Sequence, residues 1–394
     1  MKDIYHFERK ISTILLLCFF MSLHGISVSH ARFLERRDAK KPPQSRIGCY
    51  PSPTLSTHFL DRKELGTHGY RFNWSEKNGI VYTCKAGHID IYHLREAADW
   101  TAYLADKTFE HLEKNETEFS FKLKEGSLCF VKLAYPENWK DLSQNDKEHI
   151  ARDISIRIGQ YLAYTAGTWH EILTWFGYKS RGFYPEFPSA FSWEDNFSNL
   201  LGSYIAVPAL QDTEYTFDEA MTLALDRELV KLDVQSRHVA RGAAEKVRGI
   251  WYSGDFLFFV RMKKRHFDIG LDDGFVTPVI VPGVCECEGA QTQSYPVPTI
   301  DSLSEYGFSM EVEIEPKEWE THKIQSVVYP DDKERKNRIE PDKHFASIMT
   351  YIKKDALKRY GYDADLSNAT PQEQARIYSK RSHKNTILSW IWLH

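Results

Sequence analysis

Apolar residues recur at helical spacing along several long stretches of the chain. The strongest stripe lies in residues 147–176, where Ile150, Ile154 and Ile158 begin a run that ends at Gly177, a favourable helix stop. Similar patterns predict helices over 90–112, 235–251 and 341–360. A capping box, Thr216 with Glu219, predicts one more helix that ends near residue 232.

Strand patterns lie before and after these helices. Residues 80–82, 118–134 and 275–284 are strand-like, and residues 310–315 alternate strictly between apolar and charged side chains. Helices and strands do not alternate regularly, which argues against a βαβ fold. The pattern therefore predicts an α+β protein with a predominantly helical core, flanking strands and a β-containing C-terminal part.

The first 31 residues have the layout of an export signal. Basic residues precede an apolar run that is densest at residues 14–20, and small residues stand before a cleavage point after Ala31. Because the dense run is short for a membrane-spanning helix, cleavage is preferred over an uncleaved anchor. Lipidation at Cys18 is the less favoured alternative, because Leu17 is not the small residue that such a site needs.

The rest of the chain is expected to form one large unit. Residues 32–50 are basic and contain prolines, which predicts a linker, with a tether to a membrane surface as the alternative. Residues 51–394 are predicted to form a single α+β domain, and a subdivision near residues 252–275 remains open.

Composition excludes two classes of protein. The chain has 51 Lys and Arg against 55 Asp and Glu, so it lacks the basic excess of a general nucleic-acid binder. Its 10 Trp, 21 Tyr and 23 Phe residues exclude a disordered chain, because so many aromatic side chains need a core.

Five cysteines would remain in an exported chain, which implies an oxidising compartment. Cys285 and Cys287 are too close for an easy mutual disulfide, and one of them is expected to pair with Cys49 or Cys84. Cys129 lies in an apolar strand pattern and is expected to be buried and inert.

Three polar clusters could carry chemistry. The first places His88 and His93 around a helix start that Asp90 can cap; the two histidines either converge on a metal or are polar side chains at the helix entrance. The second, His170-Glu171 on the long helix, begins like a zinc-protease motif, but Thr174 replaces its second histidine.

The third cluster lies in residues 188–199. Ser192 can cap a helix whose third position is Asp195, and either Glu194 or Asp195 can then face a site. Each of the three clusters also has a purely structural interpretation, as a helix cap or a hydrogen-bonded core histidine.

Together the clusters suggest a divalent metal site. His93, His170 and Glu194 are the expected ligands, Glu171 is the expected general base, and zinc suits such imidazole and carboxylate ligands. A serine hydrolase built on Ser192 or Ser198 with His170 is less favoured, since no nucleophile elbow is present.

Three stretches, residues 79–101, 168–171 and 191–202, together resemble a family of bacterial envelope proteins catalogued only as a domain of unknown function. The resemblance would cover roughly residues 47–365. It implies export to the cell envelope and a single long domain, and it implies no catalytic residue.

The sequence thus predicts a periplasmic or secreted protein. The leading hypothesis is a metal-dependent hydrolase that acts on an envelope component. The alternative is a non-catalytic protein that binds glycan or lipid through an aromatic-lined groove, with peripheral membrane contact as a further option and no nucleic-acid partner.

Overall fold

The computed structural model describes residues 34, 38, 40–46, 50–52, 57–180, 184–254, 260–317, 320–331 and 336–360. The predicted signal peptide, Cys18 and Cys49 lie outside these residues. None of the helices in the described ranges combines the length and apolar character needed to cross a membrane.

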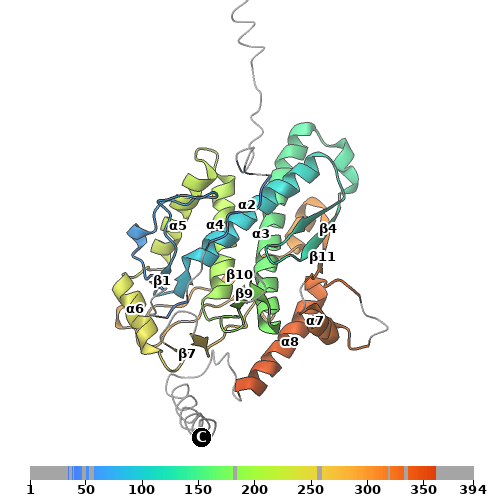
Figure 1. Cartoon of the computed structure of the whole chain (residues 1–394). Coiled ribbons are helices and arrows are strands. Elements are labelled where there is room, and N and C mark those ends of the chain that lie inside the picture. The colour runs from blue at the N-terminus through green and yellow to red at the C-terminus, as the bar shows by residue number, and fades with distance from the viewer. Residues whose placement is uncertain are drawn as a thin grey trace, which may run out of the picture.

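Three helices form the centre of the molecule: α2 (Ile91–Glu113), α3 (Gln144–Phe176) and α4 (Asp195–Gln211). Helix α2 packs along both α3 and α4 (Figure 1). Glycines bring the backbones close together. A Cβ atom on Gly159 of α3 would lie 2.6 Å from the Thr101 carbonyl oxygen of α2, and one on Gly202 of α4 would lie 2.0 Å from that of Leu94.

Local sequence explains where these helices begin and end. Asp90 caps α2 by accepting a hydrogen bond from the Tyr92 N–H, and Ser143 caps α3 through the Asp146 N–H. Helix α3 ends at Gly177, whose φ of 111° is in the left-handed region. The predicted helices over 90–112 and 147–176 are therefore confirmed, with α3 beginning three residues earlier.

The remaining helices surround this centre. They are α5 (Phe217–Lys231), α6 (Arg237–Lys246), α7 (Thr321–Val328) and α8 (Pro341–Tyr360), with short 3-10 turns η1 (Arg62–Glu64), η2 (Glu137–Asp141), η4 (Cys285–Cys287) and η5 (Asp301–Tyr306). The predicted capping box of Thr216 and Glu219 opens α5. Helix α6 is shorter than the 235–251 expected.

The largest sheet in the described residues is antiparallel, with the order β11–β4–β3. Its strands are β3 (Glu118–Lys122), β4 (Leu128–Ala134) and β11 (Ser309–Glu315), and their alternate residues are buried. Because β11 pairs with β4, segments on either side of residues 252–275 share one sheet. The predicted α+β class with C-terminal strands is confirmed.

Small two-stranded pairings complete the strands. They are β1 (Ile80–Thr83) with β2 (Gly87–Asp90), β5 (Lys179–Ser180) with β6 (Tyr184–Pro185), β7 (Tyr252–Ser253) with β8 (Arg261–Met262), and β9 (Phe275–Val276) with β10 (Tyr295–Pro296). The strand expected over 275–284 is only two residues long. Beyond it the prolines at 278 and 282 remove ladder donors.

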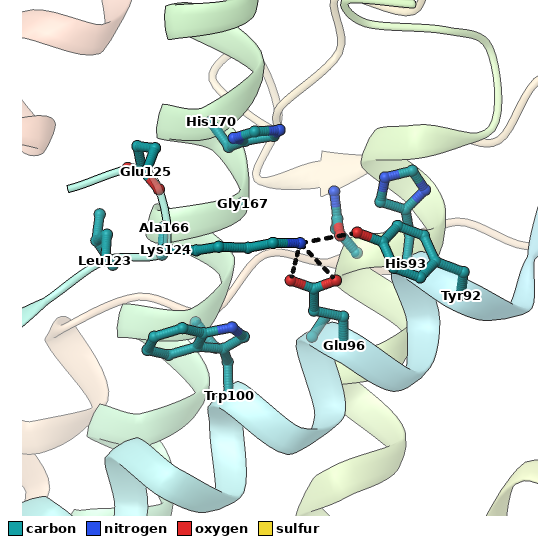
Figure 2. Close-up of a pocket in the computed structure, with 13 residues that line it drawn as sticks. Tyr92, His93, Glu96, Trp100, Leu123, Lys124, Glu125, Ala166, Gly167 and His170 are labelled. Carbon is teal, nitrogen blue, oxygen red and sulfur yellow. Dashed lines mark hydrogen bonds and ion pairs between the residues drawn. The ribbon is translucent and has the colours of Figure 1, made fainter. Parts of the chain in front are cut away.

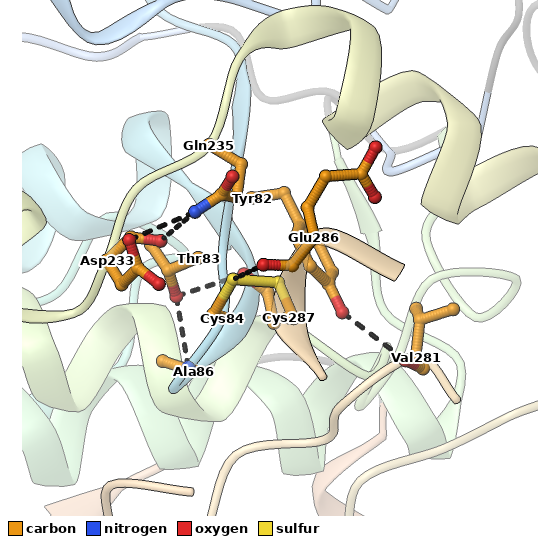
Figure 3. The surroundings of a disulfide bond; sticks show 10 residues. Tyr82, Thr83, Cys84, Ala86, Asp233, Gln235, Val281, Glu286 and Cys287 are labelled. Atoms are coloured by element: carbon orange, nitrogen blue, oxygen red, sulfur yellow. Dashed lines mark hydrogen bonds between the residues drawn. A yellow bond between two sulfur atoms is a disulfide. The ribbon is translucent and has the colours of Figure 1, made fainter. Parts of the chain in front are cut away.

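A disulfide joins Cys84, in the turn after β1, to Cys287 in η4 (Figure 3). It confirms the expected pairing of one of the two close cysteines with Cys84, while Cys285 is a free, exposed thiol. Nearby, the Tyr82 hydroxyl donates to the Val281 carbonyl over 3.4 Å. Cys129 is buried in β4, as expected.

Part of the predicted linker is fixed to the domain. Arg46 is buried, and its guanidinium contacts the Glu76 carboxylate at 2.7 Å and the Asp99 carboxylate at 2.7 Å. It also donates to the Gly69 carbonyl over 2.9 Å. Residues 40–46 therefore behave as an anchored segment and not as a flexible linker.

Candidate functional site

A cavity of about 80 Å³ lies between α2 and α3 (Figure 2). The turn between β3 and β4 covers one side of it, and α4 contributes one residue. The lining residues are Tyr92, His93, Glu96, Ala97, Trp100, Leu123, Lys124, Glu125, Ala163, Ala166, Gly167, His170 and Asn199.

One face of α2 and one face of α3 form the two main walls of the cavity. His93, Glu96, Ala97 and Trp100 follow the i, i+3, i+4, i+7 spacing of one face of α2. On α3, the lining residues of 163–170 follow the same spacing, with alanine and glycine before His170. These small residues leave space open between two helices that otherwise pack closely.

His93 is held firmly at one ring nitrogen. Its Nδ1 lies 3.0 Å from Asp90 Oδ2 and 3.3 Å from Asp195 Oδ1. The side chain keeps 24% of its surface exposed, and Nε2 has no hydrogen-bond partner among the described residues. Burial opposes charge on the ring, but the carboxylates of Asp195 and Asp90 outweigh it and raise the pKa of His93 to about 10.

Asp195, which contacts His93, and its chain neighbour Glu194 also have raised pKa values. Burial raises the pKa of Asp195 to about 7, although the charge of His93 opposes the shift. Burial and the neighbouring Asp195 raise the pKa of Glu194 well above its ordinary value. Burial and like charge both favour the protonated form of a carboxyl, and both act on Glu194.

His170 lies on the α3 wall of the same cavity. Its Nε2 is 3.3 Å from Glu186 Oε2. Burial acts to lower the pKa of His170, but the hydrogen bond with Glu186 and the charge of Glu171 raise it to about 9. The structure thus brings His93 and His170 to one cavity, with His93 paired to Asp90 and Asp195 and His170 paired to Glu186.

Lys124 extends from the β3–β4 turn between the helices. Its ammonium donates to the Tyr92 hydroxyl over 3.0 Å and to the Glu96 carboxylate over 2.9 Å (Figure 2). Sequence reasoning missed Lys124, Glu96 and Trp100. The available signal was the polar turn of residues 124–127 between two alternating segments, opposite the helix face that carries His93.

Glu171 has a different position from the one expected of a general base. It is buried, does not line the cavity, and accepts a hydrogen bond of 2.5 Å from the Phe191 N–H. It therefore holds the loop that leads into α4. Glu194 is also buried away from the lining, as the residue before α4, whereas Asp195 reaches His93.

The start of α4 differs from the expected one. The helix begins at Asp195, and Ser192 does not act as its N-cap. Instead the Ser192 N–H donates to Asp195 Oδ2 over 3.1 Å. His88 points into the core, where Nε2 contacts the Ala240 carbonyl at 2.9 Å and burial lowers its pKa to about 4.

The expected metal ligands do not form a metal-binding group. Within the described ranges, no three His, Cys, Asp or Glu side chains are arranged to hold a metal ion. The structure gives the site of His93, His170 and Glu194 no support.

Fold and cavity together define a helix-rich α+β protein with a polar cavity that is lined by His93, Lys124 and His170. The chain belongs to the family described as Protein of unknown function (DUF4056), whose model matches residues 54–271. The match includes every lining residue of the cavity. No curated protein and no solved structure matches the chain.

Proposed function

We propose that the protein is an exported hydrolase of a polar envelope component, with the cavity as its active site and His93 as its proton donor. One observation carries the proposal: the His93 ring lines the cavity while Asp90 and Asp195 hold its Nδ1. An imidazole oriented in this way presents its other nitrogen in a fixed direction. Export rests on the layout of residues 1–31.

The raised pKa of His93 sets the direction of proton transfer. Near neutral pH the ring carries both protons, so it acts as an acid and not as a base. In the proposed reaction Nε2 donates its proton to the leaving group as the bond to that group breaks. Water adds to the electrophilic atom and gives up a proton to the carboxylate of Glu125 in the cavity wall. Solvent then returns this proton to His93.

The lining favours a neutral or zwitterionic substrate. Lys124 is matched by Glu96, and His170 by Glu186, so the basic groups are compensated. The rings of Tyr92 and Trp100 add flat apolar surface. Sugar and amino-acid units of the envelope combine such polar and apolar faces, whereas a polyanion would meet the carboxylates.

The proposal is tested with purified chain and a soluble digest of bacterial peptidoglycan, with products detected by mass spectrometry. A product heavier by one water is expected. H93Q should slow its formation by roughly 100-fold or more while leaving fragment binding intact. H111Q is the matched control, since His111 pairs with Glu116 on the outside of α2. Equal rates in H93Q and wild type would refute the role of His93.

A chelation arm separates this mechanism from the metal hypothesis. The acid–base mechanism predicts that turnover survives dialysis against EDTA. Loss of turnover, with recovery on addition of zinc, would instead favour His93 and His170 as metal ligands.

A second candidate function, non-catalytic binding of glycan, is favoured by the two aromatic rings in the cavity wall. Tyr92 and Trp100 line the cavity from the same helix that carries Glu96. Binding of the fragments by wild type, its loss in W100A, and no product at any pH would select this function.

A further inference from the structure

An unusual pair of aromatic side chains stands outside the core. Trp74 is 90% exposed and Phe72 is 68% exposed. Their ring centroids are 4.7 Å apart in a T-shaped arrangement. Apolar rings are normally removed from water, so a tryptophan left almost fully exposed beside a phenylalanine indicates a contact surface.

The loop that carries them, residues 66–77 (the aromatic loop), is internally bonded. Asn73 donates to Thr67 Oγ1 over 3.0 Å, and its Oδ1 accepts from the Ser75 N–H over 2.9 Å. Gly66 has a φ of 66°, and a Cβ there would lie 1.7 Å from the Ser75 carbonyl oxygen. The side chains of Thr67, Asn73 and Ser75 thus bond to one another, while the rings of Phe72 and Trp74 face solvent.

The base of the aromatic loop is fixed to the domain. The Gly69 N–H donates to Glu76 Oε2 over 3.0 Å, and the Tyr70 N–H donates to Asp218 Oδ1 of α5 over 2.8 Å. Glu76 in turn pairs with the buried Arg46. The rings are therefore presented on a rigid support, which lowers the entropic cost of docking.

Basic side chains lie beside the rings. Residues 40–46 run along the loop, because Arg71 donates to the Pro42 carbonyl over 2.9 Å and Gln44 to the Gly69 carbonyl over 2.6 Å. Lys40 and Lys41 are exposed, and their ammonium groups have no acidic partner in the described part of the chain. Two acids of these segments are already paired: Asp38 with Arg71, and Glu76 with Arg46.

We propose that the aromatic loop, with Lys40 and Lys41, docks the protein on an anionic lipid surface. Tryptophan and phenylalanine settle at the boundary between headgroups and acyl chains, and lysines attract anionic headgroups. A glycan is the less favoured partner, because Thr67, Asn73 and Ser75 are already bonded within the loop. The inference goes beyond the proposed hydrolase and does not depend on it.

The test is co-sedimentation of the chain beginning at Arg32 with lipid vesicles. This chain retains every described contact and lacks the predicted signal. Binding is expected on vesicles of equal parts phosphatidylcholine and phosphatidylglycerol, with weaker binding at high salt. The double variant F72S/W74S should lower the partition coefficient at least roughly tenfold. K40A/K41A should lower it by about tenfold on these vesicles and leave it unchanged on pure phosphatidylcholine.

L271S is the matched control, since Leu271 is 51% exposed and lies outside the aromatic loop. It should bind like wild type. Circular dichroism and thermal unfolding confirm that each variant is folded. No sedimentation of wild type, or equal sedimentation of F72S/W74S, overturns the inference. Retention of wild type on insoluble peptidoglycan through Trp74, without vesicle binding, also overturns it in favour of a glycan.

Discussion

Nη1 of Arg46 lies 2.7 Å from Oδ2 of Asp99, and both side chains are almost completely buried. The pair joins a segment that precedes the domain to the middle of α2. Asp99 also contacts His68 Nε2 at 2.7 Å, so its carboxylate is bonded from two sides. A buried carboxylate needs such partners, because charge removed from water is costly.

We therefore expect R46M to destabilise the fold by about 3 kcal/mol, since it leaves Asp99 and Glu76 buried without their main cation. Urea unfolding followed by circular dichroism measures the loss. R71M is the matched control, because the pair of Arg71 with Asp38 is partly exposed. It should cost less than about 1 kcal/mol. Equal losses in both variants would show that the Arg46 pair is not special.

The charge of His93 should make stability depend on pH. Its folded pKa of about 10 exceeds the ordinary value of 6.5, so the folded state binds its proton more tightly. The stabilisation from this charge is fully present below pH 6.5 and is lost as pH rises through 10. The difference in unfolding free energy between wild type and H93Q should therefore shrink as pH rises from about 7 toward 10, a range in which the Asp195 carboxyl, with a pKa of about 7, is increasingly ionised. A difference that grows with pH would contradict the raised pKa.

Asp195 should be the main cause of the raised pKa of His93. Its carboxylate lies 3.3 Å from Nδ1 and is the largest contribution that raises this pKa. In D195N the imidazole signal in a proton NMR titration should move toward lower pH by at least about one unit. D226N changes an exposed acid that pairs with Arg62 and should leave the titration unchanged. An unchanged titration in D195N would assign the shift to Asp90.

The disulfide of Cys84 and Cys287 should contribute strongly to stability, because it closes a loop across 203 residues. C287S is expected to lower the free energy of unfolding by about 2–5 kcal/mol. C285S, two residues away, changes an exposed free thiol and should be neutral. Thiol labelling of the native protein should modify Cys285 before Cys129, which is buried. If C285S proves as damaging as C287S, the pairing is incorrect.

The local pattern of apolar and capping residues predicted single helices and strands well, because their limits depend on neighbouring residues. The stripe before Gly177 predicts α3, and Asp90 caps α2 in the expected way. Contacts between segments far apart in the chain could not be predicted from the sequence. Nothing local indicates that Arg46 reaches Asp99 or that β11 pairs with β4, because such contacts depend on tertiary register. The strand expected over residues 275–284 was wrong in length, since prolines interrupt its ladder.

The candidate cavity contains two of the residues that the sequence indicated as functional. Helix position and polarity identified His93 and His170, and the structure places both on one cavity. The choice between Glu194 and Asp195 depended on where α4 begins, and a shift of one residue turns a side chain by about 100° around the helix. Glu171 is adjacent to His170 and therefore points elsewhere. Lys124 was missed because it lies in the turn between β3 and β4. Its position at the cavity depends on how this hairpin packs against the helices, which the local sequence does not indicate.

The crossing of α2 and α4 offers the last test, because it brings Asp195 to His93. At the crossing, a Cβ on Gly202 would lie 2.0 Å from the Leu94 carbonyl oxygen, which is backbone and cannot move aside. G202A should therefore push α4 away from α2 and cost roughly 1–3 kcal/mol. It should also lower the pKa of His93, since the distance to Asp195 grows.

G242A is the matched control: nothing lies within 4 Å of the added methyl group in α6. There, alanine should stabilise the helix by about 0.5–1 kcal/mol. Urea unfolding and the imidazole titration measure both effects, and a neutral G202A with an unchanged pKa would show that the helices do not cross this closely.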